Sequence, residues 1–195
     1  MMIKRLAPVL CSVAVLLAVP TCTVRASATW PSTGSTQPSA EPPARSYPVR
    51  VYFSKHPQSD QNATAVFAVR RVSPTLAVAA FTIGQLLVGP TQTETKAGYY
   101  SALAGLLHGP SDCGGPAVRI MLNSRGTTVE PGTATVRFCR HSMSGGIFDD
   151  VRVRSEISRT LTQFPSIKRV VILNKVGYCF GDLSGRNTCL RSLAP

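Results

Sequence analysis

Four of the six cysteines, those that follow residue 28, are the residues whose type and spacing most directly suggest chemistry in this chain. An even number of cysteines in an exported chain favours two disulfides, for which three pairings are possible. Two of the cysteines enclose a short segment rich in turn-forming residues, so a disulfide between these two needs only a local loop. The remaining two cysteines would then pair with each other. The local pair is Cys179 and Cys189, and the remaining pair is Cys113 and Cys139.

Metal and nucleophilic chemistry are less well supported. The chain has no Cys-x-x-Cys and no paired His-Cys cluster, so neither a metal nor another cofactor is expected. His56, His108 and His141 fall in expected loops and share no motif, and neither Gly-x-Ser-x-Gly nor His-Glu-x-x-His occurs. A triad assembled by the fold stays open as an alternative, because triads are recognised by geometry. The sequence favours a protein that is not an enzyme.

One pair of neighbouring carboxylates, Asp149 and Asp150, has the residue type needed for general acid–base work. The pair directly precedes a helical stripe, in which Val153, Ile157 and Leu161 recur at intervals of four. Acids at a helix start accept free amide hydrogens and complement the helix dipole. Capping is therefore the preferred interpretation.

The N-terminus has the pattern of an export signal. Lys4 and Arg5 precede an apolar stretch at 6–19, and the small residues at 26–28 suit a signal peptidase. We expect a signal peptide over 1–28, with an uncleaved anchor or a lipid on Cys22 as alternatives. Residues 29–46 are rich in Pro, Ser and Thr, which predicts a disordered linker. The globular domain is expected over 47–195, in the periplasm, the cell envelope or outside the cell.

The exported part of the chain is basic. Of the 21 basic and 9 acidic residues, 18 and 9 follow residue 28, a formal charge of +9. Such a charge favours anionic envelope polymers or membrane surfaces as partners. Aromatic residues are not interleaved with the basic clusters, so no specific nucleic-acid recognition is expected.

The domain itself alternates strands with two main helices. Strands are expected at 49–53, 64–72, 117–123, 133–140 and 168–175, with a turn at 124–126. The first helix is expected to start at Ser73-Pro74 and stop at Gly89-Pro90, and residues 91–98 form a short helix or a loop. The buried face of the first helix should comprise Leu76, Ala80, Ile83 and Leu87, with Thr82 and Gln85 turned away. This pattern predicts an α+β fold with two helices on a mixed, largely antiparallel sheet.

Several segments of this pattern resemble the GerMN domain, a module of bacterial sporulation and germination proteins. The resemblance rests on Tyr52-Phe53, the run Leu-Leu-Val-Gly-Pro-Thr at 86–91, Gly-Tyr-Tyr-Ser at 98–101, the strands at 118–122 and 135–138, and the unit at 157–173. It implies a non-catalytic envelope module with no catalytic residues to transfer. The four cysteines set the chain apart from simpler members and resemble the versions secreted by cyanobacteria.

The expected function is accordingly an interaction module that binds an envelope protein or assembles with copies of itself. The alternatives are an accessory subunit of a cell-wall enzyme and an electrostatic binder of anionic polymers. The expected partner contacts lie on the basic side of the second helix and in the C-terminal loop: Arg152, Arg159, Phe180, Asp182 and Arg186.

Overall fold

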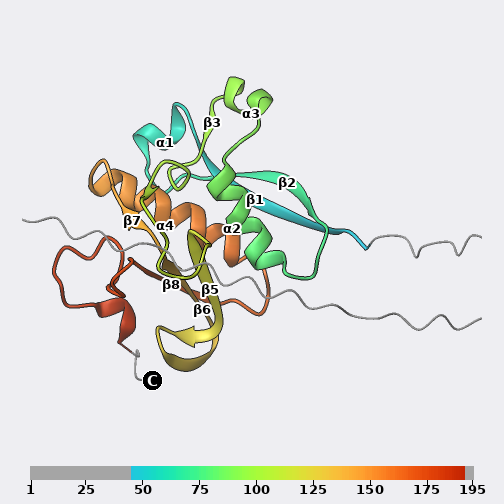
Figure 1. Ribbon diagram of the computed structural model, residues 1–195. Coiled ribbons are helices and arrows are strands. Elements are labelled where there is room, and N and C mark those ends of the chain that lie inside the picture. The colour runs from blue at the N-terminus through green and yellow to red at the C-terminus, as the bar shows by residue number, and fades with distance from the viewer. Residues whose placement is uncertain (1–44, 192–195) are drawn as a thin grey trace, which may run out of the picture. The chain divides into compact units, whose positions relative to one another are not determined.

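The computed structural model describes residues 45–191 (Figure 1). The expected signal peptide and nearly all of the expected linker lie outside these residues. In chain order the elements are β1 (Tyr47–Lys55), α1 (Gln58–Gln61), β2 (Phe67–Ser73), α2 (Val78–Val88), α3 (Gln92–Lys96), β3 (Tyr99–Tyr100), β4 (Leu107–His108), β5 (Val118–Arg125), β6 (Thr128–Phe138), β7 (His141–Ser142), α4 (Ile147–Leu161), β8 (Arg169–Leu173) and a 3-10 turn (Thr188–Leu190).

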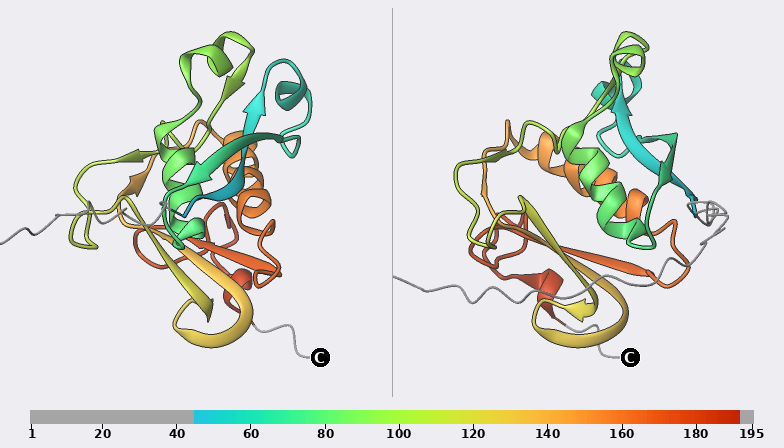
Figure 2. Two further views of the ribbon diagram at one scale, coloured as in Figure 1. Left: turned by 90° about the vertical axis from the view of Figure 1, so that its right-hand side faces the viewer. Right: turned by 45° about the vertical axis from the view of Figure 1, so that its right-hand side comes forward.

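The strands form two three-stranded sheets and one short pair. The sheets have the orders β2-β1-β3 and β5-β6-β8, and β4 pairs with β7. Among the described strands only β8 runs parallel to its neighbour, so the pairing is mixed and mostly antiparallel. The long helices α2 and α4 lie between the two larger sheets (Figures 1 and 2). The predicted α+β class is confirmed.

Helix α2 begins later than its sequence suggests. Ser73 was expected to cap it, but the Ser73 side chain is buried at the end of β2 and exchanges hydrogen bonds with the backbone of Thr75. The helix starts at Val78, which leaves Leu76 outside it and 77% exposed. The expected stop is confirmed at Gly89, whose φ of +84° favours glycine.

The later start also changes the face that α2 buries. Ile83 is buried as expected, but Ala80 is exposed and Thr82 is fully buried instead of facing away. Burial of Thr82 leaves no unsatisfied hydroxyl, because Oγ1 donates to the carbonyl of Ala79 at 2.9 Å. The buried stripe passes through Thr82, Ile83 and Leu86.

Helix α4 carries the predicted apolar stripe into the core. Val153, Ile157 and Leu161 are fully buried. The two acids lie in the first turn as expected, where they complement the helix dipole. The capping expectation is wrong, however, because no side chain bonds the free amides and Asp149 pairs with Arg152 at 2.7 Å instead.

A polar stripe on α4, continued just past its end by Gln163, covers the free edge of β1. The edge amides of Ser54 and Tyr52 donate to Glu156 and Thr160, and that of Arg50 donates to Gln163, at 2.8–3.1 Å. Alternate strand residues are about 6.6 Å apart and helix residues four apart are about 6 Å apart, so the two repeats match. The helix thereby satisfies backbone groups that an open sheet edge would leave free.

Glu156 is the centre of this stripe. Its carboxylate is fully buried and also accepts from the amides of Ala102 and Leu103 and from the hydroxyls of Ser54 and Ser101. Burial raises the pKa of Glu156, while the bonds from Ala102 and Ser54 act in the opposite direction. One side chain therefore joins α4, β1 and the segment after β3.

Both predicted disulfides are present. Cys113 bonds Cys139, and Cys179 bonds Cys189. The second bond closes the C-terminal loop as expected. Two disulfides indicate an oxidising, exported location. Among residues 45–191, no helix has the length and apolar character needed to span a bilayer.

Candidate binding cleft

A hollow of about 410 Å³ lies against the outer face of the β5-β6-β8 sheet. The side chains of β5 alternate, so Val118 and Ile120 face the helices while Arg119 and Met121 face the hollow. Val176 and Gly177, from the chain that follows β8, form another wall. We call this hollow the arginine cleft, and its principal lining residues are Arg119, Met121, Arg137, Leu173, Val176 and Leu190.

Two arginines stand directly opposite each other in the cleft. Arg119 of β5 is the register partner of Arg137 of β6. Like charges at directly opposed positions repel and destabilise a sheet unless something neutralises them. The cleft therefore combines a partly apolar lining with concentrated positive charge.

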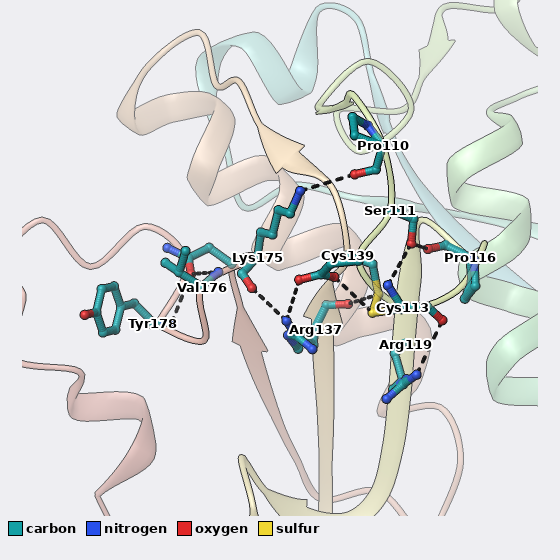
Figure 3. Close-up of polar contacts among 12 residues, drawn as sticks. Pro110, Ser111, Cys113, Pro116, Arg119, Arg137, Cys139, Lys175, Val176 and Tyr178 are labelled. Carbon is teal, nitrogen blue, oxygen red and sulfur yellow. Dashed lines mark hydrogen bonds and ion pairs between the residues drawn. A yellow bond between two sulfur atoms is a disulfide. The ribbon is translucent and has the colours of Figure 1, made fainter. Parts of the chain in front are cut away.

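Arg137 is neutralised within the domain (Figure 3). Its guanidinium donates to the Asp112 carboxylate at 2.7 Å and to the carbonyl of Lys175 at 2.9 Å. Arg119 is more exposed, and within residues 45–191 its guanidinium donates only to the carbonyl of Cys113, at 3.5 Å. Among residues 45–191 no carboxylate forms an ion pair with Arg119. Arg119 is thus the side chain in the cleft with donors to spare.

The disulfide between Cys113 and Cys139 positions the counter-charge. It attaches the loop before β5 to the residue that follows β6. The amide of Asp112 donates to the carbonyl of Cys139 at 2.9 Å. The amide of Cys139 donates to the carbonyl of Ala117 at 2.8 Å. These contacts place Asp112 beside Arg137, so the bond has a specific role in building the cleft.

Arg125 closes the far end of the cleft and was wrongly expected in a turn. It is the last residue of β5 and is only 6% exposed. Its guanidinium binds the Glu130 carboxylate through two nitrogens and donates to the carbonyls of Cys189 and Arg191 at 2.9 and 2.8 Å. The bond from Arg125 lowers the pKa of Glu130 to about 2. Arg125 therefore fastens the C-terminal loop to the sheet.

The C-terminal loop exposes fewer of the expected partner-contact residues than the sequence suggests. Phe180 was expected to project toward a partner, but it is 7% exposed and packs edge-on against Phe138, with ring centroids 5.0 Å apart. Asp182 is half-buried, and its carboxylate accepts from the amide of Ser184 within the same loop at 2.9 Å. Only Arg186 of the three expected loop contacts is exposed. Burial of aromatic surface and the needs of a tight turn override projection into solvent.

The expected contacts on α4 also differ from each other. The Arg152 side chain is only 14% exposed, because it pairs with Asp149 and donates to the carbonyl of Ser59 at 3.2 Å. Its expected role as a free surface contact is therefore wrong. Arg159 is exposed, and its guanidinium lies 5.7 Å from the centroid of the Tyr52 ring.

Two of the histidines lie in strands and not in loops. His108 and His141 are register partners in β4 and β7, an arrangement that only the fold reveals. His56 lies in a turn as expected. Its Nδ1 contacts the Asp60 carboxylate at 2.7 Å, and its ring stacks on Tyr100. The bond with His56 lowers the pKa of Asp60.

One group of residues resembles a metal site by proximity. Asp112, Cys113 and Cys139 bring potential ligand atoms within 4.8 Å of one another. The two sulfur atoms are bonded to each other, however, and a disulfide is not the thiolate that a metal requires. The carboxylate is already occupied by Arg137. This cluster supports the cleft and does not form a metal centre.

The sequence interpretation did not identify the arginine pair. Alternation places Arg119 and Arg137 on the polar faces of two expected strands, but register decides whether they meet. Near the turn, Arg125 pairs with Thr128, and that register would bring Arg119 opposite Ala134. A bulge at 122–124 shifts the pairing and brings Arg119 opposite Arg137.

Comparison of the chain with models of known protein families, with curated proteins and with solved structures finds no match.

Proposed function

We propose that this chain is an exported, non-catalytic interaction module of the GerMN type that binds a protein of the cell envelope. The two disulfides support an oxidising location. The binding surface in this proposal is the arginine cleft.

The observation that carries the proposal is the unequal treatment of Arg119 and Arg137. The domain neutralises Arg137 and leaves the guanidinium of Arg119 with a single long contact. Arginine presents a planar fork of donors that matches a carboxylate in two parallel bonds. A carboxylate from a partner would pair with Arg119, the arginine of the pair that has no carboxylate partner among residues 45–191.

Apolar side chains beside the cleft support a protein as the partner. Val176 lines the cleft and is 68% exposed, and Tyr178 nearby is 59% exposed. Tyrosine and arginine are enriched both in protein interfaces and among the residues that dominate their binding energy. The partner surface in this proposal is an acidic side chain flanked by apolar residues, supplied by another protein or by a second copy of this chain.

Crosslinking in the native envelope followed by mass spectrometry tests the proposal. With the chain from residue 29 as bait, Arg119→Ala should reduce the yield of the crosslinked partner by on the order of tenfold, the effect expected at the centre of an interface. Arg186→Ala is the matched control, because Arg186 is exposed but does not line the cleft. An unchanged yield with Arg119→Ala would overturn the proposal, and a loss with Arg186→Ala alone would move the binding surface to the loop.

A further inference from the structure

A second basic surface lies on the outer face of β1 and β2 and on the adjoining side of α4. We call it the basic face. Its members are four exposed arginines and two polar residues between them: Arg50, Arg70, Arg154, Arg159, Tyr52 and Gln163. It is distinct from the arginine cleft, which belongs to the other sheet.

The strand part of the basic face is built by register. Arg50 of β1 is directly opposite Arg70 of β2, and both line a hollow of about 390 Å³. Gln163 lines the same hollow and is fixed there, because its amide group exchanges hydrogen bonds with the backbone of Arg50 at 2.6 and 2.8 Å. The two arginines thus share one concave surface.

The helix part adjoins the strand part at Tyr52. Tyr52 is two residues after Arg50 and lies on the same side of β1. The guanidinium of Arg159 lies over the Tyr52 ring, which holds it above the strand. Arg159 and Arg154 then line a second hollow, of about 320 Å³. The four positive charges therefore follow one path from β2 across β1 to α4.

The domain does not neutralise this path. Arg71 also lines the first hollow but pairs with Glu94, and Arg125, Arg137, Arg152 and Arg169 likewise pair with carboxylates. Within the part of the chain that the structure describes, no carboxylate pairs with any of the four arginines of the basic face. The pair Arg50 and Arg70 is the clearest case, because directly opposed like charges destabilise a sheet.

We propose that the basic face binds a linear polymer that carries phosphate groups. Arginine binds phosphate through two parallel, charge-assisted bonds. The tetrahedral phosphate group offers oxygen atoms in several directions, so one group can accept from both Arg50 and Arg70 across their shared hollow. The next groups along the polymer reach Arg159 and Arg154. A flexible chain can enter the two hollows, which a flat bilayer surface cannot follow.

The experiment measures binding of long-chain polyphosphate to the chain from residue 29, by fluorescence anisotropy at several salt concentrations. The test variant is Arg50→Gln/Arg70→Gln/Arg159→Gln. The control, Lys96→Gln/Arg186→Gln/Arg191→Gln, removes the same charge from exposed residues outside the basic face. The affinity of the test variant for polyphosphate should fall on the order of tenfold or more. The magnitude of the slope of log affinity against log salt should also fall by about 2–3, because about one fewer counterion is released for each phosphate contact that is lost.

The controls separate the alternatives. Equal losses of polyphosphate affinity in the two variants would overturn the proposal in favour of general charge attraction. Unchanged polyphosphate affinity in the test variant would also overturn it. Poly-glutamate of matched charge should bind more weakly than polyphosphate, and equal binding would overturn the choice of phosphate. Phosphatidylglycerol vesicles that bind through the same arginines, with no polyphosphate binding, would identify a membrane surface instead. Arg50→Gln/Arg70→Gln alone provides a milder variant, since the structure assigns neither side chain a partner among residues 45–191. None of these results depends on the arginine cleft.

Discussion

The two larger sheets each carry a pair of arginines in direct register, and the domain treats the two pairs differently. Arg137 in the arginine cleft has a carboxylate and a carbonyl as partners, whereas Arg50 and Arg70 on the basic face have no ion pair within residues 45–191. The counter-charge in the cleft comes from a disulfide-tethered loop, whereas Arg50 and Arg70 have no ion-pair partner among residues 45–191. A half-neutralised pair suits one carboxylate at a defined place, and a pair without counter-charge suits repeated charges on a polymer.

The supports of the two pairs differ as well. The register of Arg50 and Arg70 depends on β1, whose free edge is covered by polar side chains of α4. The counter-charge in the cleft depends on the bond between Cys113 and Cys139. One support consists of hydrogen bonds and the other is covalent, so they can be removed separately.

Removal of Glu156 should have the largest effect. Glu156→Ala leaves the amides of Ser54, Ala102 and Leu103 without their acceptor in a buried site. Because each unsatisfied buried donor costs about 1–3 kcal/mol, the free energy of unfolding should fall by about 4 kcal/mol or more. Urea unfolding monitored by circular dichroism measures this. Glu156→Gln retains one acceptor and should lose less, and an equal loss in both variants would contradict the role given to the carboxylate.

Removal of the Cys113–Cys139 bond comes next. The bond closes a loop with a sequence separation of 26. Cys113→Ser/Cys139→Ser should lower the free energy of unfolding by about 3 kcal/mol, mainly through greater freedom of the unfolded chain. In the folded variant, partner capture at the cleft should fall while polyphosphate binding is retained. Loss of polyphosphate binding at full folding would show that the two regions are not independent.

Asp112→Asn removes the counter-charge from the arginine pair in the cleft, so that this pair resembles the one on the basic face. It removes the charge that neutralises Arg137, so the repulsion between Arg137 and Arg119 is no longer offset. The pair Asp112–Arg137 is about one-third exposed, so we expect a loss of only about 0.5–1 kcal/mol in thermal unfolding. The same variant should bind polyphosphate more tightly than the wild type. If Asp112→Asn does not change the affinity for polyphosphate, the shape of the surface and not its charge would explain why polyphosphate prefers the basic face to the cleft.

The smallest expected effect has the opposite sign. Arg50→Gln removes one of two opposed like charges on an exposed sheet face, so the domain should become more stable by about 0.2–0.5 kcal/mol. Arg137→Gln is the matched change in the cleft and should destabilise, because it leaves Asp112 without its partner. Differential scanning fluorimetry at low salt compares the two, and high salt should reduce the gain from Arg50→Gln. Destabilisation by Arg50→Gln would mean that the bare pair is not repulsive.

Parts of the fold were predictable from local pattern. The apolar stripe of α4 repeats at helical spacing over Val153, Ile157 and Leu161, and the stop of α2 at Gly89 needs only the backbone freedom of glycine. The start of α2 was not predictable, because Ser73 offers the same local bonds to a turn as to a helix. The spacing of Glu156 and Thr160 on α4, and of Gln163 just after it, is visible in the sequence, but only the position of β1 beside the helix shows what these side chains bind.

The expected partner contacts show the limit most clearly. Arg152 and Arg159 share one helix, yet Arg152 is taken up by Asp149 and Ser59 while Arg159 lies exposed over Tyr52. Phe180 looked available in a short loop and is in the core. Residue type does not distinguish these cases, because the partners come from segments far away in the chain.

Composition and spacing were sufficient for the fold class, for the basic charge and for cysteine pairs that the folded domain contains, since these follow from the residues themselves and from short-range geometry. The tertiary structure decided which arginines meet. A bulge at 122–124 sets the register that opposes Arg119 to Arg137, and the packing of α4 on the edge of β1 joins Arg159 to Arg50 and Arg70. Register and packing arise from contacts between distant segments, and they determine whether scattered positive charges become binding surfaces.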